Sequence, residues 1–227
     1  PTNVPINFLY SFFFGLLSGN SNIVRISENT FESSKKIIFL LSKLVKKTFN
    51  NIELITDRPL QTNLDEIRQI KKDWPDRAVV VSLMLPMQEE IWAKYVPMIE
   101  DTGADGLELN FGCPHGMSER GMGAAVGQVP EYISMATSWC KNVARVPVIV
   151  KLTPNVTNIL PPAKAAMDAG ADAVSLINTI NSIMRVDYDT LQMHPTTDGL
   201  GTHGGYCGEA VKPIALHMVA EIARHNE

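Results

Sequence analysis

A cysteine in a glycine-rich loop is the first sign of chemistry in this sequence. The loop follows the apolar segment Gly106 to Asn110, and residues 108–123 contain Cys113, one histidine and four glycines. α/β enzymes carry their catalytic groups on loops at the C-terminal ends of strands, so this thiol is a candidate catalytic group. A structural cysteine at the end of a strand is the alternative.

Amide side chains occur at the ends of two predicted strands. Asn110 ends the segment that leads to the cysteine, and Asn178 and Thr179 follow the segment Ala173 to Ile177. An amide both donates and accepts hydrogen bonds, which suits a planar heterocycle with alternating C=O and N–H groups. A single asparagine at such a position is more often structural than functional.

Lys151 lies inside the apolar segment Val148 to Leu152. A buried ammonium requires an anionic partner, which a phosphate-bearing or electron-rich cofactor would supply. The alternative is a lysine whose charged end reaches solvent at the end of the strand.

Gly204 and Gly205 begin a glycine-rich segment before the last predicted helix. A glycine-rich turn at a helix N-terminus can bind a phosphate, and a plain tight turn explains the same glycines.

Apolar segments of strand length alternate with segments of helical periodicity after residue 50, which predicts an α/β fold. We predict strands at 78–83, 106–110, 148–152 and 173–177, and helices at 63–73, 88–102, 130–143, 162–169 and 210–225. The strand 78–83 is continuously apolar and is predicted to be buried on both faces. A (β/α)8 barrel fits best and a doubly wound sheet second, but a complete barrel needs about 250 residues and eight strands.

The phrase Gly-Ala-Asp precedes two of the predicted strands, at residues 103–105 and 170–172. We expect it to form the short turn that leads from the end of a helix into the next strand.

Composition and charge limit the remaining possibilities. Residues 1 to about 50 contain no Met or Cys, which predicts a domain boundary near residue 48, between a segment 1–48 and a segment 49–227. A chance difference in composition or an ordinary N-terminal extension is the alternative. The net charge of −4 argues against a nucleic-acid-binding protein. The three cysteines are widely spaced, which is typical of a cytoplasmic protein and does not match the spacing of a metal site. The apolar run Ile6 to Leu17 is too short to cross a membrane and is predicted to be a buried helix.

The segment from about residue 51 to 227 resembles the FMN-binding catalytic domain of dihydropyrimidine dehydrogenase, in the dihydroorotate dehydrogenase-like superfamily. The motifs that carry the resemblance are Asn51 to Ile55, Glu108 to Met117, Val150 to Asn155, Ile177 to Thr179, Gly204-Gly205 and Lys212 to Leu216. The resemblance implies a partial (β/α)8 TIM barrel that lacks its first two and last two strands. The dihydroorotate enzymes have Asn after Cys-Pro, and His115 at that position favours a free pyrimidine base over orotate.

The resemblance also implies a reaction, in which FMN serves to reduce the 5,6 double bond of uracil or thymine. Cys113 would donate the proton to C5, because a thiol with a pKa of about 8.5 is mostly protonated at neutral pH. Asn110, Asn178 and Thr179 would bind the pyrimidine, together with Gln88, which replaces an asparagine of the family. Lys151 would stabilise the anionic reduced flavin, and Gly204 and Gly205 belong to the cofactor-binding motifs.

Further partners follow from the same resemblance. Electrons would come from NADH through FAD and iron–sulfur clusters on missing segments or on a partner subunit, within an oligomer. The chain begins at Pro1 rather than Met and ends before the expected phosphate-binding strands, which predicts a fragment or a processed piece.

Residues 1–48 resemble a different family, the long-chain acyl-CoA reductases of the aldehyde dehydrogenase superfamily. Asn3 to Pro5, Leu16 to Asn20 and Asn22 to Ser27 carry this resemblance, which makes the N-terminal segment an unrelated α/β piece and the chain a fusion. Three alternatives to pyrimidine reduction remain open: a non-catalytic fragment that binds no FMN, dihydroorotate oxidation, and an acyl-CoA reductase role for the first 48 residues.

Overall fold

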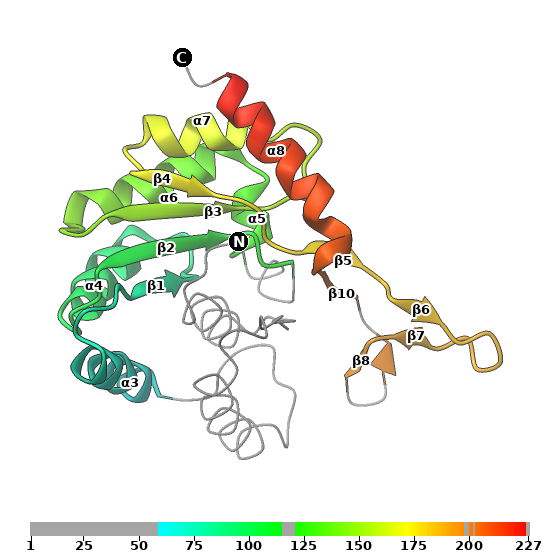
Figure 1. Ribbon diagram of the computed structural model, residues 1–227, viewed down its shortest axis with the longest axis horizontal. Coiled ribbons are helices and arrows are strands. Elements are labelled where there is room, and N and C mark those ends of the chain that lie inside the picture. The colour runs from blue at the N-terminus through cyan, green and yellow to red at the C-terminus, as the bar shows by residue number, and fades with distance from the viewer. Residues whose placement is uncertain (1–58, 115–120, 198–199, 202, 226–227) are drawn as a thin grey trace. The chain divides into compact units, whose positions relative to one another are not determined.

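The computed structural model describes residues 59–114, 121–197, 200–201 and 203–225 (Figure 1). The chain divides into two units, residues 1–57 and 58–227, and every described residue belongs to the second unit. The predicted helix at Ile6 to Leu17 and the acyl-CoA reductase-like segment lie outside the described residues. The domain boundary near residue 48 therefore stays a prediction.

Four parallel strands form the central sheet, β1 (Val80–Leu83), β2 (Gly106–Phe111), β3 (Val148–Leu152) and β4 (Ala173–Ser175). They lie side by side in chain order, β1-β2-β3-β4, with no reversal of direction or order. The prediction of an α/β fold with a parallel sheet is confirmed. The span of β3 agrees with the sequence prediction, whereas β4 ends two residues earlier because the chain leaves the sheet after Ser175.

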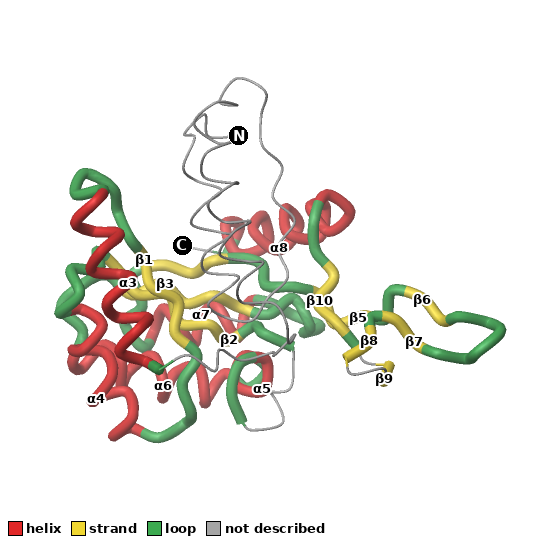
Figure 2. The backbone as a smooth tube through the Cα atoms, turned by 90° about the horizontal axis from the view of Figure 1, so that it is seen from below, coloured by secondary structure: helices red, strands yellow, loops and turns green. Residues whose placement is uncertain are grey.

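Helices alternate with these strands, as the apolar periodicity predicted. They are α3 (Leu60–Asp73), α4 (Glu89–Glu100), α6 (Pro130–Val143), α7 (Leu160–Asp168) and α8 (Lys212–Arg224), with a single-turn helix α5 (Ala124–Gly127) before α6. Figure 2 shows α4, α6 and α7 on one side of the sheet. Pro130 and Pro161 lie in the first turns of α6 and α7, where the missing N–H has no intrahelical partner to lose.

The core lies between the helices and one face of the sheet. Alternate strand residues on this face are nearly inaccessible and pack against buried helical side chains, among them Trp92, Ile133 and Ala166. The strand residues of this face are Val81, Leu83, Leu107, Leu109, Phe111, Val148, Val150 and Leu152. Because side chains alternate along a strand, the remaining strand positions face away from the helices.

The opposite face of the sheet, here called the inner face, carries the polar residues. Two register rows cross it, Ser82–Glu108–Ile149–Ala173 and Asn110–Lys151–Ser175. Strand β1 alternates half-buried and buried residues, so the prediction that 78–83 is buried on both faces is wrong for this strand. The sequence does not show this alternation of buried and half-buried positions, because the half-buried inner-face position 80 is occupied by an apolar valine.

The two Gly-Ala-Asp phrases form the same turn, as predicted. Gly103 and Gly170 have positive φ angles of 87° and 94°, which a glycine adopts without steric cost. Each turn delivers the chain from a helix, α4 or α7, into the next strand, β2 or β4.

The aspartates of these turns join neighbouring strands. Asp105 Oδ2 accepts a hydrogen bond of 2.6 Å from the N–H of Val79 and one of 2.8 Å from Lys71 Nζ. Asp172 repeats the pattern with the N–H of Val148 at 2.7 Å and Lys141 Nζ at 2.8 Å. The Lys141 ammonium and the Val148 N–H hold the pKa of Asp172 below its ordinary value.

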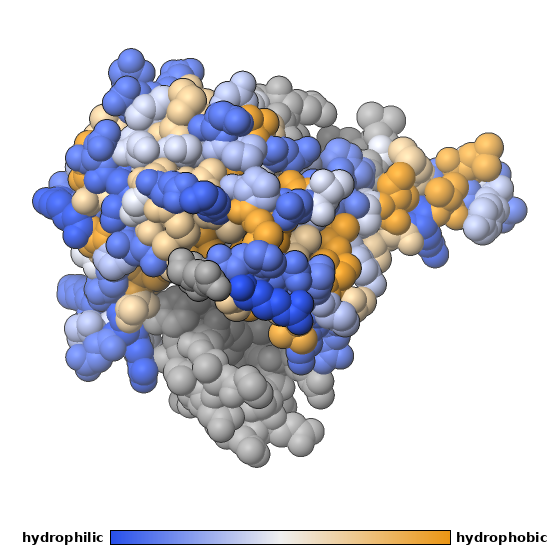
Figure 3. All heavy atoms as spheres, turned by 90° about the horizontal axis from the view of Figure 1, so that it is seen from above, coloured by the Kyte–Doolittle hydropathy of each residue, from blue (hydrophilic) through white to orange (hydrophobic). Residues whose placement is uncertain are grey.

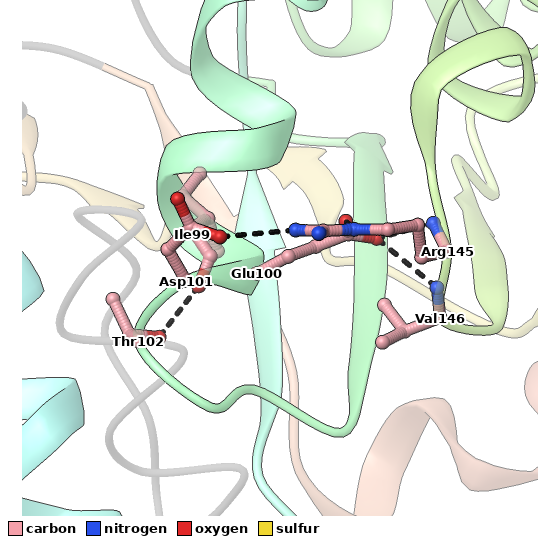
Figure 4. Close-up of polar contacts among 6 residues, drawn as sticks. All are labelled: Ile99, Glu100, Asp101, Thr102, Arg145 and Val146. Carbon is pink, nitrogen blue, oxygen red and sulfur yellow. Dashed lines mark hydrogen bonds and ion pairs between the residues drawn. The ribbon is translucent and has the colours of Figure 1, made fainter.

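Glu100, the last residue of α4, is a third carboxylate of this kind (Figure 4). Its Oε1 accepts hydrogen bonds from the N–H groups of Arg145 and Val146, at 2.6 and 3.0 Å, and Arg145 Nε binds Oε2 at 2.7 Å. Burial alone would raise the pKa of Glu100, but the hydrogen bonds and the charge of Arg145 outweigh burial and hold it below its ordinary value. Helix α4 is thereby fastened to the segment that enters β3.

A β-rich arm separates β4 from α8 and was not predicted from the sequence. Its antiparallel pairs are β5 (Ile180–Ser182) with β10 (Gly204–Tyr206), β6 (Arg185–Val186) with β7 (Met193–His194), and β8 (Thr196–Thr197) with β9 (Leu200–Gly201). The arm projects from the body, and Figure 3 shows hydrophobic atoms on its surface. Within the described ranges, no helix has the length and apolar character required to span a membrane.

Candidate functional site

Asn110 and Asn178, which the sequence predicted to act together, are in direct contact. Asn178 Nδ2 donates a hydrogen bond of 2.8 Å to Asn110 Oδ1, and both residues are buried. Asn110 Oδ1 also accepts a hydrogen bond from the N–H of Gly112. The N–H of Asn178 donates to the carbonyl of Leu152, which holds the chain after β4 against the end of β3.

The contact leaves one amide group of Asn110 unused. Asn110 Nδ2 is buried and has no hydrogen-bond partner among the described residues, although Asn110 is only 1% exposed. The hydroxyl oxygen of Thr179 is likewise buried without a partner. A buried donor without a partner costs about 1–3 kcal/mol, so both groups are suited to a ligand that supplies the missing hydrogen bonds.

Two glycines allow the residues of this site to approach one another. A Cβ atom at Gly112 would overlap the Asn178 side chain, and a Cβ at Gly205 would lie 2.7 Å from Thr179 Cβ. Gly205 is therefore a packing partner of Thr179. The expectation that Gly204 and Gly205 form a turn at a helix N-terminus is wrong, because both lie in strand β10, several residues before α8 begins at Lys212.

Asn155 connects the ends of β3 and β4, a role that the sequence did not reveal. Its Nδ2 donates to Thr153 Oγ1 at 2.9 Å and to the carbonyl oxygen of Thr179 at 3.1 Å. Its Oδ1 accepts a hydrogen bond from the N–H of Asn181. The side chain thus positions Thr179, and the only signal for it in the sequence was an asparagine just after a strand.

Cys113 lies two residues beyond β2 and is 1% exposed. Its carbonyl oxygen accepts a hydrogen bond of 3.0 Å from the N–H of Ala124, which closes the loop between them. A Cβ at Gly123 would lie 3.3 Å from Cys113 Cβ and 3.2 Å from Met84 Sδ, so the loop returns close to the end of β1. Within this loop, residues 115–120, including His115, lie outside the described residues.

The arm reaches the cysteine loop through His203. The His203 ring Nε2 lies 3.2 Å from the carbonyl oxygen of Pro114, and since a carbonyl only accepts, the ring nitrogen donates.

Cys140, unlike Cys113, is a core residue of α6, where burial raises the pKa of its thiol to about 12. Of these two cysteines, Cys113 is the one that lies at the ends of the parallel strands.

Lys151 occupies the inner face of β3, beside Asn110 in the register. Its Nζ lies 3.5 Å from Glu108 Oε1, which also accepts a hydrogen bond of 3.1 Å from Ser82 Oγ. The anionic partner that we expected from a cofactor is therefore supplied by a protein carboxylate. Glu108 was missed, although a glutamate within an otherwise apolar strand two residues before Asn110 indicates the same face.

Gln88 does not join this group of residues. It is exposed, directly precedes α4, and its side chain makes no hydrogen bond among the described residues. Its carbonyl oxygen instead accepts the first backbone hydrogen bonds of α4.

The inner face and the strand ends beside it have the chemistry to hold planar, electron-rich rings. Lys151 provides a cation suited to the flavin of FMN, while Asn110 offers a buried amide donor and Thr179 a buried hydroxyl, each without a partner, to a second ring. Within the described part of the chain, no three or more His, Cys, Asp or Glu side chains are grouped so that they could hold a metal ion.

Several known proteins are similar to this chain in sequence. Dihydropyrimidine dehydrogenase (NADP(+)), chloroplastic, of Arabidopsis thaliana is 46% identical over 176 residues, which cover 78% of this chain and 41% of that protein. The NAD-dependent dihydropyrimidine dehydrogenase subunit PreA of Escherichia coli K12 is 36% identical over 179 residues, 79% of this chain and 43% of the subunit. The catalytic subunit of dihydroorotate dehydrogenase B (NAD(+)) of Pyrococcus abyssi is 40% identical over 162 residues, 70% of this chain and 49% of the subunit.

The chain spans less than half the length of these relatives. The sequence model of the family described as dihydroorotate dehydrogenase matches residues 49–227, which include all four strands of the parallel sheet and the residues at their ends. The chain belongs to the dihydroorotate dehydrogenase family.

Proposed function

We propose that residues 49–227 form part of an FMN-dependent enzyme that reduces the 5,6 double bond of uracil or thymine, with Cys113 as the proton donor. The contact between Asn110 and Asn178 carries the proposal, because it leaves a buried amide donor beside the strand ends. The relatives from Arabidopsis thaliana and Escherichia coli, both named dihydropyrimidine dehydrogenase, support this substrate class.

The proposed fold is part of a (β/α)8 barrel. Strand order β1-β2-β3-β4 without reversal and helices on one face of the sheet both support a barrel over a doubly wound sheet. A doubly wound sheet has helices on both faces and a reversal of strand order. The inner face would then be the barrel interior, and the strand ends would form the active-site end.

In the proposed reaction, FMN in its reduced form would supply the hydride that reaches C6 of the pyrimidine. Cys113 gives its thiol proton to C5, so that hydride and proton together saturate the double bond. Asn110 donates from Nδ2 to a ring carbonyl, and Thr179 offers its hydroxyl to the same ring edge. Asn178 holds the Asn110 amide in place.

The proposed cofactor contacts come from Lys151, Gly204 and Gly205. The Lys151 ammonium would lie beside the flavin ring and stabilise negative charge on it, while Gly205 would keep Thr179 in place. Electrons would arrive from NADH through a partner subunit with FAD and iron–sulfur clusters. The Escherichia coli relative is named as a subunit, which supports such a partner.

The decisive experiment is a half-reaction under anaerobic conditions. The protein is loaded with FMN and reduced, then mixed with uracil, thymine or orotate while flavin reoxidation is followed by absorbance. We expect reoxidation by uracil or thymine, and Cys113→Ala should slow it by about 10² to 10⁴-fold, the usual contribution of a general acid. Cys140→Ala is the matched control, because Cys140 is equally buried but lies in the core, and it should keep the wild-type rate.

Other outcomes would each contradict a specific part of the proposal. Undiminished reoxidation in Cys113→Ala would remove the cysteine from the mechanism. Protein that takes up no FMN would indicate a non-catalytic fragment. Reduction of bound FMN by dihydroorotate, with no reaction of uracil or thymine, would establish the activity named in the Pyrococcus abyssi relative.

A further inference from the structure

Glu108 and Lys151 form an ion pair on the inner face of the sheet. Their side chains are 17% and 25% exposed, and Lys151 Nζ lies 3.5 Å from Glu108 Oε1. The same carboxylate oxygen accepts a hydrogen bond from Ser82 Oγ, so that side chains of β1, β2 and β3 meet at one atom. This polar cluster belongs to the face that carries the proposed site.

The register places Glu108 below the ends of the strands. Glu108 lies beside Ile149, whereas Lys151 lies beside Asn110, which is one step nearer the C-terminal end of the sheet. Glu108 therefore holds the ammonium of Lys151 from the interior side and leaves Asn110 next to it. An ammonium on a flexible four-carbon chain needs such a partner to keep one orientation.

Two other lysine–carboxylate pairs that link separate elements have a different task. Asp105 and Asp172 each bind a lysine and also a backbone N–H group at or just before the start of a strand, so they fasten the backbone. Glu108 binds only the side chains of Ser82 and Lys151 among the described residues. A carboxylate that fastens no backbone group is suited to orienting a side chain.

We propose that Glu108 is a positioning residue that holds the Lys151 ammonium in its place on the inner face, toward the flavin of the proposed function. The inference rests on the proposed function for its consequence, the binding of FMN, but the ion pair itself can be tested without the cofactor.

The first test follows Lys151 in cofactor-free protein. Lysine acetylation by acetic anhydride is located and timed by mass spectrometry in wild type, Glu108→Gln and the control Asp172→Asn. We expect Glu108→Gln to speed acetylation of Lys151 about fivefold, the effect of losing roughly 1 kcal/mol of pairing, and to leave Lys141 unchanged. Asp172→Asn should speed Lys141 and leave Lys151 unchanged, because Asp172 pairs with Lys141.

The second test asks whether Glu108 acts through Lys151. FMN dissociation constants and the absorbance spectra of bound FMN are compared in wild type, Glu108→Gln, Lys151→Met and the double variant. We expect Glu108→Gln to weaken FMN binding about fivefold in the wild-type background and less than about twofold beside Lys151→Met. The spectra of Lys151→Met and the double variant should superimpose, whereas that of Glu108→Gln should differ from wild type.

Two results would overturn the proposal. Unchanged acetylation of Lys151 in Glu108→Gln shows that the carboxylate does not hold the ammonium, and equal losses of FMN affinity in both backgrounds show that it acts independently of Lys151. Wild-type protein that binds no FMN contradicts the proposed function, and acetylation alone then decides the role of Glu108. Glu108→Asp keeps the charge on a shorter side chain, so Lys151 should be acetylated at a rate between those of wild type and Glu108→Gln. This variant takes the place of Glu108→Gln if Glu108→Gln fails to fold.

Discussion

At the scale of single residues, the side chains of Asn110, Asn178 and Thr179 differ in which of their polar groups form hydrogen bonds and which have no partner. Asn178 Nδ2 donates a hydrogen bond to Asn110, and Asn178 Oδ1 accepts one from the N–H of Thr179, so both ends of this side chain are occupied. Asn110 keeps one buried donor unused. The three residues therefore differ, since Asn178 orients its neighbours while Asn110 and Thr179 each keep a buried polar group without a partner.

The packing of Gly205 against Thr179 predicts the effect of one added methyl group. Gly205→Ala would place its Cβ 2.7 Å from Thr179 Cβ, whereas Gly204→Ala would meet the Pro195 ring at 3.2 Å. We expect Gly205→Ala to lower the free energy of unfolding by about 1–3 kcal/mol, as overpacking does, and to weaken FMN binding. Chemical denaturation and flavin titration of both variants measure this difference. Equal stability of the two variants would contradict the close approach of Gly205 to Thr179.

At the scale of the elements, helix and strand spans were well predicted where periodicity was strong. Helix α6 and strand β3 have the predicted bounds, and α3 begins three residues earlier than predicted because Pro59 precedes its first turn. The arm that contains β5 to β10 was missed, because its short strands lack a long apolar or alternating pattern. Helix α4 ends at Glu100, whose carboxylate then binds the segment before β3.

The lowered pKa of Glu100 predicts a pH-dependent contribution to stability. A carboxyl group whose pKa is lowered by folding stabilises the protein above its ordinary pKa of 4.5 and loses this effect as the pH falls through the lowered value. We expect Glu100→Gln to reduce the free energy of unfolding by about 1.5–3 kcal/mol at pH 7. The difference from wild type should shrink as the pH falls below about 4.5.

The control for this helix end is Asp101→Asn. Asp101 also pairs with Arg145, but its side chain is 65% exposed, so its loss should cost less than about 1 kcal/mol. Urea denaturation from pH 3 to pH 7 provides the comparison. A stability difference for Glu100→Gln that stays constant over this range would contradict the role of the ionised carboxylate.

At the scale of the whole described unit, the two ends of the sheet have separate tasks. The N-terminal ends of the strands are fastened by Glu100, Asp105 and Asp172, each of which accepts hydrogen bonds from backbone N–H groups. The C-terminal ends carry the asparagines and Cys113. The fastening contacts and the proposed site thus lie at opposite ends of the same strands, which is the arrangement of stability and chemistry in (β/α)8 barrels.

The repeated aspartate turns predict additive effects on stability. Asp105→Ala and Asp172→Ala each remove the partner of one backbone N–H group and one lysine, and the two sites share no partner. We expect each change to cost about 1 kcal/mol and the double variant to show the sum within about 0.5 kcal/mol. Urea denaturation of the two single variants and the double variant measures these values. A double variant much less stable than the sum would show that the turns are coupled, contrary to this expectation.

The sequence alone determined the alternation of strands and helices, the Gly-Ala-Asp turns and the candidate residues Cys113, Asn110 and Lys151. These features follow from local periodicity, turn chemistry and the polarity of residues at strand ends, which are all properties of short segments. The tertiary structure decided which of these residues meet. Strand register placed Lys151 beside Asn110 and brought its ammonium within reach of Glu108, and the close approach at Gly112 placed Asn178 beside Asn110. The residues of these two contacts are separated by 43 and by 68 positions in the sequence. Such contacts depend on how the strands align, and no local pattern encodes that alignment.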